Sequence, residues 1–309
     1  MPEQLYQRDV YGKTLIELAK KDQSIVVLDA DLSSSTRTGW FAKEFPGRFF
    51  NFGVAEQNMA ATAAGLASCG KKVFLSTFAM FATGRAWDQV RNSISYNNFD
   101  VKIVATHAGI TVGPDGASHQ ALEDICLMRA IPNMQIIVPC DGEQTRDAIL
   151  AAASNKGPFY VRLGRTKIAT IENKPPFVFG KAQVLSDGKD AAIIACGLMV
   201  NEAVLAVKSL AKKGVSVKLI NIHTIRPIDA QAIIDAAKTT RGIVVCEEHS
   251  SVGGLASAVE DVLCENYPAK MRKVAVHNRF GQSGEPDELL KEYRLTSADI
   301  EKQVLSVLE

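Results

Sequence analysis

Short apolar runs alternate with helix-forming segments along most of this sequence, and that alternation limits the folds open to it. Ser24–Ala30 (SIVVLDA) and Val101–His107 (VKIVATH) are largely apolar runs, which is typical of strands buried on both faces. Gln4–Lys20 carries leucine and valine on one side of a helical pattern, and Glu143–Ser154 is rich in alanine. The repeated order of strand and helix predicts an α/β fold with mostly parallel sheets covered by helices on both faces.

A stretch containing two adjacent prolines divides this alternation into two parts. Thr166–Gly180 contains the pair Pro175-Pro176 and continues neither a strand nor a helix pattern. A second series of strands and helices follows it. The chain has 309 residues, 47% of them hydrophobic, which is enough for two separate cores. We expect two α/β domains, at residues 1–168 and 181–309, joined by a linker at 169–180.

Composition excludes several classes of partner. The formal net charge is +1, so no excess of charge favours nucleic acid or an anionic membrane. The six cysteines are scattered without a CxxC spacing, which favours reduced thiols over a disulfide framework or a metal site. The first residues lack the apolar core of a signal peptide, and no run is long enough to span a membrane. We expect a cytoplasmic protein with no metal ligands of its own.

One carboxylate lies where the local pattern does not require one. Arg48–Gly53 predicts a short strand and Ala55–Ser68 a helix rich in alanine and glycine, so Glu56 falls in the first turn of that helix. A carboxylate there stabilises the helix through the macrodipole, and on this stretch alone we favour that interpretation. The alternative is a buried acid that hydrogen-bonds a ring nitrogen of a ligand.

A long glycine-rich loop brings chemically active side chains together. Residues 106–120 have the sequence THAGITVGPDGASHQ and contain His107, Asp115 and His119. His107 ends a strand that is expected to be buried and His119 precedes a helix, so both can point into one pocket. Long loops inside compact domains often carry functional residues. We therefore favour a functional site over a surface loop with solvated histidines.

Three motifs together resemble a known family. GVAEQNM after a strand, STFAMF, and THAGITVGPDGASHQ resemble, in this order, the pyrimidine-binding and C-terminal domains of transketolase, and the resemblance covers nearly the whole chain. In that family a GDG motif in an N-terminal domain binds the diphosphate of thiamine diphosphate and its divalent metal, Mg²⁺ or Ca²⁺. That motif is not found here in its strand-to-helix context. The chain thus resembles the smaller subunit of a split transketolase, whose N-terminal subunit supplies those ligands.

The resemblance implies roles for several cofactor-binding residues. Glu56 would hydrogen-bond the pyrimidine N1′ from an apolar pocket and favour the imino tautomer, which then removes the thiazolium C2 proton. Phe78 and Phe81, spaced i and i+3, would share a helix face and stack on the pyrimidine ring, although a role as plain core aromatics competes. Asp31 follows a strand where the family places an acid near the thiazolium, but an aspartate there is also a common loop former.

The resemblance also implies a site for sugar phosphates. His119 would contact the C1 hydroxyl and carbonyl of the ketose, because a histidine can move protons near the working pH. Asp115 would recognise the hydroxyl configuration on the C2 side. The acceptor phosphate would be bound by Arg8, Ser35, His107 and Arg165. Arg162 competes with Arg165 for that role.

The implied function is transfer of a two-carbon ketol unit from a ketose phosphate to an aldose phosphate. We expect a homodimer of this chain flanked by two N-terminal subunits, with neither chain active alone. His107 favours this function over 1-deoxy-D-xylulose-5-phosphate synthase, in which an acidic residue tends to occupy that position. That synthase, the β subunit of a 2-oxoacid dehydrogenase, and a non-catalytic assembly subunit remain alternatives.

Overall fold

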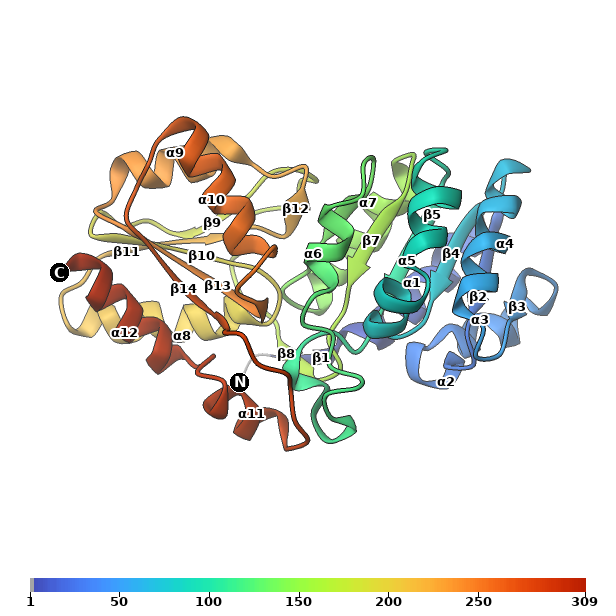
Figure 1. Cartoon of the computed structure of the whole chain (residues 1–309), viewed down its shortest axis with the longest axis horizontal. Coiled ribbons are helices and arrows are strands. Elements are labelled where there is room, and N and C mark those ends of the chain that lie inside the picture. The colour runs from blue at the N-terminus through green and yellow to red at the C-terminus, as the bar shows by residue number, and fades with distance from the viewer. Residues whose placement is uncertain (1–2) are drawn as a thin grey trace.

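Two mostly parallel sheets, each covered by helices, lie end to end along the long axis of the molecule (Figure 1). The computed structural model describes residues 3–309. The N-terminal unit, blue to green in Figure 1, contains the larger sheet, and the C-terminal unit, yellow to red, contains the smaller one. The expected fold class, with two α/β units, is confirmed.

The larger sheet belongs mainly to the N-terminal unit. Its seven strands are β2 Ile25–Asp29, β3 Phe49–Asn51, β4 Lys72–Ser76, β5 Val101–Ala105, β6 Gln135–Ile137, β7 Phe159–Arg162 and β12 Thr224–Arg226. Their spatial order is β12-β6-β7-β5-β4-β2-β3, and all neighbours are parallel except β12, which is antiparallel to β6. β2 and β5 are buried along their full length, as the apolar runs predicted.

The smaller sheet lies in the C-terminal unit. Its five strands are β9 Gln183–Ser186, β10 Ala191–Ala195, β11 Val217–Asn221, β13 Ile243–Ser250 and β14 Met271–Val276. Their spatial order is β14-β13-β10-β11-β9, with β9 antiparallel to β11 and the other pairs parallel. β12 follows β11 in the chain but joins the larger sheet. The boundaries at residues 168 and 181 stay a prediction, and the two units exchange backbone contacts across them.

Helices cover both faces of the larger sheet. They are α1 Gln7–Lys21, α2 Ser33–Thr36, α3 Thr38–Glu44, α4 Glu56–Ser68, α5 Trp87–Gln89, α6 Asp124–Arg129 and α7 Gly142–Ser154. α1 and α7 pack together on one face, where Tyr11 and Ala148 join a core cluster with Phe74 of β4. On the other face, Met59 of α4 packs in a cluster with Leu75 of the same strand. Alternate residues of β4 thus serve the two faces.

The helices of the C-terminal unit complete the core. They are α8 Met199–Lys212, α9 Ala230–Thr239, α10 Leu255–Asn266, α11 Pro286–Glu292 and α12 Ser297–Leu308. The cluster that contains Met59 of α4 also contains Ile194 of β10 and Leu255 of α10, so one apolar core runs through both units. Within residues 3–309, no helix combines the length and apolar character needed to cross a membrane.

Residues expected in the first helix and at the start of the linker region pair with each other instead. Gln4–Tyr6 forms strand β1, which is antiparallel to β8, Lys167–Ala169. The prediction of a helix over these first residues was wrong, because a distant strand satisfies their backbone N–H and C=O groups. The linker that follows is packed as well: Lys174 Nζ lies 2.8 Å from the buried carboxylate of Asp141.

The sequence pattern of Phe78–Tyr96 predicts one continuous helix, but the structure breaks this segment into shorter pieces. A π-helical turn spans Phe81–Arg85, α5 follows it, and a second π-helical turn spans Val90–Ser95. Phe78 precedes these turns and forms a parallel bridge with Thr106 just beyond the carboxyl ends of β4 and β5. This pairing joins the start of the segment to a neighbouring strand end, a constraint that side-chain periodicity does not reveal.

The polar stretch Asp31–Ser35, expected as a loop, contains most of the short helix α2. The fully buried carboxylate of Asp29 organises it. Asp29 accepts hydrogen bonds from Leu32 N at 2.7 Å, Thr36 Oγ1 at 2.7 Å and Thr38 Oγ1 at 2.8 Å. The sequence analysis missed this turn because Asp29 resembles the ordinary polar end of an apolar strand.

Candidate functional site

Two phenylalanines and two histidines form one cluster beside the larger sheet. The rings of Phe78 and Phe81 are stacked with centroids 5.9 Å apart, and Phe78 also stacks on His107 at 3.8 Å. His119 meets Phe81 edge-on at 5.3 Å. Stacked and edge-on arrangements are both favourable for aromatic rings. The structure thus brings together side chains that the sequence predicted as parts of one site.

Sheet topology explains why these residues meet. β4 and β5 are parallel neighbours, so their carboxyl ends lie at the same edge of the sheet. Phe78 follows β4 and His107 follows β5, and Thr106 N donates to Thr77 O at 3.2 Å between the two strand ends. His107 has a left-handed φ of 59°, which turns the chain sharply as it leaves the sheet.

His107 is held as a neutral imidazole. Its side chain is nearly fully buried, and Nδ1 lies 2.9 Å from Thr106 Oγ1. Burial, and after it the positive charges of Arg8 and Arg165, lower the pKa of His107 from its ordinary value near 6.5 to about 3. A neutral ring has one N–H donor and one acceptor nitrogen. His107 can therefore hydrogen-bond a ligand but does not add charge to the site.

Two of the predicted phosphate-binding arginines approach His107 from different segments. Arg8 of α1 donates from Nη1 to the carbonyl oxygen of Ser35 at 3.4 Å. Arg165, which follows β7, donates from Nη1 to the carbonyl oxygen of Val112 at 2.6 Å. Burial, with further positive charge nearby, lowers the pKa of Arg8. Two guanidinium groups close to one another favour an anion, as the predicted phosphate site requires.

Arg37, between α2 and α3, is a further cation that the sequence analysis missed. After burial and the two nearer arginines, its charge also lowers the pKa of His107. Arg37 Nε lies 2.6 Å from Asp9 Oδ1. An isolated arginine in a sequence gives no local signal of such a role, because most are solvated charges. Only the fold carries Arg37 to the other arginines.

Glu56 is buried but not in an apolar pocket. It is the first residue of α4 and is only 4% exposed. Arg85 Nη1 donates to Glu56 Oε1 at 2.9 Å, and the Arg85 guanidinium lies over the ring of Phe81 at 4.2 Å. The expected apolar pocket is therefore wrong on this side, because a half-exposed cation forms part of it. Arg85 ends a π-helical turn that the sequence analysis did not predict.

The two predicted acids besides Glu56 lie at exposed positions. Asp31 follows β2 with a left-handed φ of 62°, and its N–H donates to Asn51 Oδ1 at 3.0 Å. Asp115 ends the 3₁₀ turn Ile110–Asp115, in the same loop as His119. Asp115 thus shares a loop with the aromatic cluster. Asp31 is placed near it only through the carboxyl ends of neighbouring strands.

Of the two arginines considered for the phosphate, Arg162 is already engaged. Its Nε lies 2.7 Å from Asp124 Oδ2, and both side chains are buried. Tyr160 Oη donates to the same carboxylate oxygen at 2.6 Å. Arg165 is only half-buried, so it is the arginine that can turn toward a ligand.

The cluster fits a planar heterocycle with a ring nitrogen. Phe81 is half-buried, so one aromatic ring of the stack borders an open space, while the carboxylate of Glu56 supplies an acceptor. Within residues 3–309, no group of three or more histidine, cysteine, aspartate or glutamate side chains is arranged to hold a metal ion. The aromatic rings and the carboxylate therefore suit the planar organic part of a cofactor.

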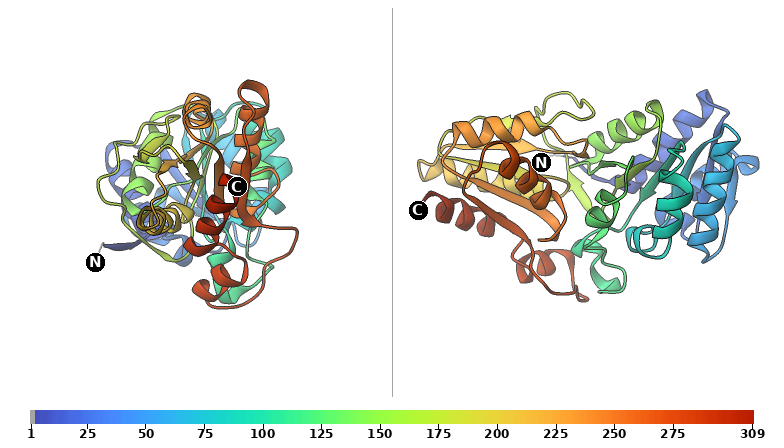
Figure 2. Two further views of the ribbon diagram at one scale, coloured as in Figure 1. Left: turned by 90° about the vertical axis from the view of Figure 1, so that its left-hand side faces the viewer. Right: turned by 45° about the horizontal axis from the view of Figure 1, so that its top comes forward.

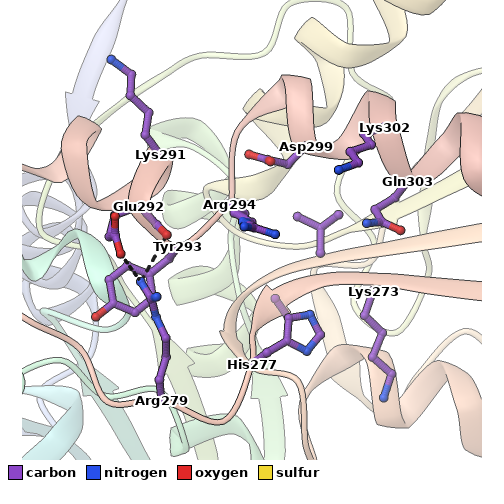
Figure 3. Close-up of a pocket in the computed structure, with 12 residues that line it drawn as sticks. Lys273, His277, Arg279, Lys291, Glu292, Tyr293, Arg294, Asp299, Lys302 and Gln303 are labelled. Atoms are coloured by element: carbon purple, nitrogen blue, oxygen red, sulfur yellow. Dashed lines mark hydrogen bonds and ion pairs between the residues drawn. The ribbon is translucent and has the colours of Figure 1, made fainter.

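A cavity in the C-terminal unit has a different lining. It measures about 540 Å³ and lies between β14 and the helices α11 and α12 (Figure 3). Several cationic side chains border it, but Arg279 is paired with Glu292 at 3.0 Å and Lys273 with Glu260 at 2.7 Å. None of the site residues predicted from the sequence lines it. The aromatic cluster of the N-terminal unit is therefore the better candidate.

Two family models match the chain in sequence order. The model of the transketolase pyrimidine-binding domain matches residues 3–170, which include the whole aromatic cluster. The model of the transketolase C-terminal domain matches residues 180–300.

Three proteins are similar to the chain over nearly its whole length. A protein of Methanocaldococcus jannaschii, named only provisionally as a transketolase C-terminal section, is 50% identical over 98% of this chain and 96% of its own length. A 6-deoxy-6-sulfo-D-fructose transketolase subunit of a Clostridium species is 40% identical over 99% and 96%. A solved structure of a split gene transketolase, an inactive β4 tetramer, has a TM-score of 0.89 and 46% identity and covers 99% of both chains.

Proposed function

Because the chain belongs to the transketolase family as a C-terminal subunit, we propose that it forms part of an enzyme that transfers a two-carbon ketol unit between sugar phosphates with thiamine diphosphate. The observation that supports this best is the cluster of Phe78, Phe81, His107 and His119 close to the buried carboxylate of Glu56. Stacked rings, a carboxylate and histidines suit the binding of a pyrimidine and the movement of substrate protons.

The cofactor would supply the nucleophilic carbon and the electron sink of the reaction. In this proposal Phe78 and Phe81 orient the pyrimidine ring, and Glu56 hydrogen-bonds the N1′ nitrogen. A carboxyl group there favours the imino tautomer, which the chemistry at C2 needs. Asp31, at the end of β2, is proposed to lie near the thiazolium. Arg85 Nη1 already occupies Oε1 of Glu56, so the cofactor has to take Oε2 or compete with Arg85 for Oε1.

The two histidines proposed to bind the substrate contact the aromatic pair directly. We place His119 at the C1 hydroxyl and carbonyl of the ketose, where it moves protons, and Asp115 at the hydroxyl on the C2 side. The phosphate would be bound by Arg8, Ser35, His107 and Arg165, with Arg37 close by. The support is electrostatic: the positive charges of Arg8, Arg165 and Arg37 all act on the buried His107, with Asp9 offsetting part of the charge of Arg37.

The active assembly is proposed to need a second chain. A separate N-terminal subunit would supply the ligands of the diphosphate and of Mg²⁺ or Ca²⁺, and two copies of each chain would form the enzyme. The related split gene transketolase supports this, since its β4 tetramer is inactive. The free chain is therefore expected to bind thiamine diphosphate weakly. Tight binding of diphosphate and metal by the free chain would contradict the proposal.

The decisive experiment is reconstitution. The purified chain is mixed with an N-terminal transketolase subunit, thiamine diphosphate and Mg²⁺, and ketol transfer from xylulose 5-phosphate to ribose 5-phosphate is assayed. Glu56→Gln should abolish transfer, because an amide cannot share an acidic proton with N1′, while circular dichroism stays unchanged. Transfer that persists at the wild-type rate in this variant would sink the assigned role of Glu56.

The choice of substrate needs a panel. One relative is a 6-deoxy-6-sulfo-D-fructose transketolase subunit, so a sulfonated ketose is the second donor to test. Pyruvate tests the synthase and dehydrogenase alternatives, and it is expected to be inert. If no substrate is turned over by the assembled chains, the chain is a non-catalytic assembly subunit instead.

A further inference from the structure

The C-terminal unit forms hydrogen bonds with both ends of the loop that carries Asp115 and His119. At the first end, Glu248 of β13 accepts hydrogen bonds at Oε1 from Thr111 N and Thr111 Oγ1, each at 2.7 Å. At the second end, Gln120 Nε2 donates to the carbonyl oxygen of Gln282 at 2.9 Å. From this geometry we propose that Glu248 is a positioning residue that sets where the loop presents its substrate-binding side chains. The inference rests on the proposed function of those side chains.

The contact with Glu248 is buried on both sides. Glu248 is 4% exposed and Thr111 is 2% exposed, so water does not replace the carboxylate. Loss of the acceptor would leave the N–H and the hydroxyl of Thr111 without a partner, which is costly in a buried position. Gly109 permits the approach: it has a φ of +86°, and a Cβ there would lie 2.3 Å from Cδ of Glu248. Two features of the chain therefore serve this one contact.

The segment that accepts the hydrogen bond of Gln120 is itself fixed within the C-terminal unit. Gln282 belongs to the segment between β14 and α11, which lies beside the loop in both views of Figure 2. Arg279 at its start bonds Glu292 and lies over the ring of Tyr293 at 3.7 Å (Figure 3). Tyr293 Oη in turn donates to the backbone of this segment at Phe280 O, 2.8 Å away. The end of α11 thus fixes the segment that receives Gln120.

The position of these hydrogen bonds at the two ends of the loop predicts which property they control. His119 directly precedes Gln120, and Asp115 lies in the turn that starts beside Thr111. Glu56 and Phe81, assigned to the cofactor, lie on other elements. A shift at Glu248 should therefore disturb substrate binding and turnover while cofactor binding is kept. A positioning error of about 1 Å can cost two orders of magnitude in rate.

The test compares two adjacent buried glutamates. Glu247 is fully buried like Glu248, but it accepts hydrogen bonds from Leu255 N and Ala256 N at the start of α10 and does not hold the loop. A glutamine would keep one acceptor oxygen, so methionine, which has none, is the test substitution, and Glu247→Met is the matched control for Glu248→Met. Thr111→Val removes only the hydroxyl bond and guards against failure of the glutamate variants to fold. All variants are made in the full chain and assembled with the N-terminal subunit.

We expect Glu248→Met to raise the KM for the donor ketose phosphate about tenfold and to lower kcat. The concentration of thiamine diphosphate that gives half-maximal activity should change less than twofold. Thr111→Val should show the same pattern at reduced size, and Glu247→Met should leave the donor KM unchanged. An equal rise of the donor KM in the Glu247 and Glu248 variants would overturn the proposal, since general loosening of the C-terminal unit would then explain both.

Hydrogen exchange of the free chain gives a readout that does not depend on activity. Amides of residues 110–119 should exchange about tenfold faster in the Glu248→Met variant, while those of α4 keep their wild-type rates. Unchanged loop protection in a folded Glu248→Met chain would overturn the inference. If the wild-type assembly shows no ketol transfer at all, the proposed function fails, and the exchange data still decide whether Glu248 holds the loop.

Discussion

The pair of Glu56 and Arg85 shows how one side chain can serve two partners. Glu56 is buried, whereas Arg85 is half-exposed and also stacks over Phe81. A carboxylate that waits for a ligand in a closed environment needs a temporary hydrogen-bond donor, because a buried unpaired charge is expensive. A half-exposed cation meets that need. The pyrimidine nitrogen would compete with Arg85 for this carboxylate.

Arg85→Ala should strengthen cofactor binding in the assembled enzyme. A contact with one exposed partner is worth at most about 1 kcal/mol, so the concentration of thiamine diphosphate for half-maximal activity should fall up to about fivefold. Titration of the cofactor at saturating substrate measures this. Lys43→Ala, which removes an exposed cation in α3, serves as the control. Weaker binding in the Arg85 variant would show that Arg85 contacts the cofactor instead of competing with it.

His107 should make the free chain sensitive to acid. Burial lowers its folded pKa to about 3, so the unfolded chain, with a histidine pKa near 6.5, binds more protons over that interval. The contribution of the neutral His107 to the free energy of unfolding is therefore fully present above pH 6.5. It falls by about 2 kcal/mol as the pH drops from 6.5 to 5. Denaturation curves at both pH values measure the difference.

The control for that prediction is a second histidine. His107→Asn should lose this part of the pH dependence, while His277→Asn, at an exposed residue, should keep it. Burial also lowers the pKa of His223, to about 4, so His223 adds the same pH dependence of the unfolding free energy to every variant. Equal slopes in the wild type and the His107 variant would contradict the neutral, buried imidazole.

At the scale of elements, short polar turns depend on buried acceptors. Ser35 lies in α2 and Arg37 between α2 and α3, near Arg8 and Arg165. The carboxylate of Asp29 accepts three hydrogen bonds that fix these short helices. Neither helix is long enough to be stable by itself. Their position therefore depends on a group in the preceding strand.

Asp29→Ala should lower the free energy of unfolding by about 2–4 kcal/mol, because it leaves buried hydrogen-bond donors without an acceptor. In the assembled enzyme it should also raise the KM for phosphorylated substrates, since Ser35 and Arg37 lose their support. Urea denaturation and steady-state kinetics measure the two effects. Asp31→Asn, two positions along and exposed, keeps a residue that tolerates the left-handed φ and should change the stability by less than about 0.5 kcal/mol. A stable Asp29 variant with normal KM would exclude this role.

At the scale of the whole molecule, buried polar contacts join the two units. Arg162 of β7 pairs with Asp124 in the N-terminal unit and donates from Nη2 to the carbonyl oxygen of Glu248 in the C-terminal unit at 2.9 Å. His249 lies 4.0 Å from the same Asp124. Together with the shared apolar core, these contacts make separate unfolding of the units costly.

Arg162→Met should therefore destabilise the whole chain by about 3–5 kcal/mol, because Asp124 becomes a buried charge without its partner. The loss should appear in one unfolding transition that both units share. The double variant Arg162→Met with Asp124→Leu should recover part of the stability. Two separate transitions in calorimetry, with only one of them shifted, would show that the units unfold independently.

Much of the fold and part of the site could be predicted from local sequence. Buried strands such as β2 are marked by apolar runs, and the order of strands and helices gave the α/β class. His107 and His119 were grouped in space because they flank one glycine-rich loop, whereas Phe78 was added to them only through the family resemblance. Roles for these residues in binding remain predictions until the variants are measured.

The missed features all depend on partners distant in sequence. β1 exists because β8 pairs with it, and β12 because the edge of the larger sheet accepts it. Arg85 and Arg37 have no local signal, and each acquires its contacts only where separate segments meet. Propensity and periodicity describe a residue and its near neighbours, so they cannot report such pairings.

The sequence by itself determined the class of fold, the strands that are buried and the motifs that mark the site, since each follows from hydrophobic patterning or from residues close in the chain. The tertiary structure alone decided which cation faces Glu56, how the arginines gather around His107, and that Glu248 holds the loop through Thr111. These contacts join residues far apart in the chain, and their energies exist only after the apolar core has brought those segments together.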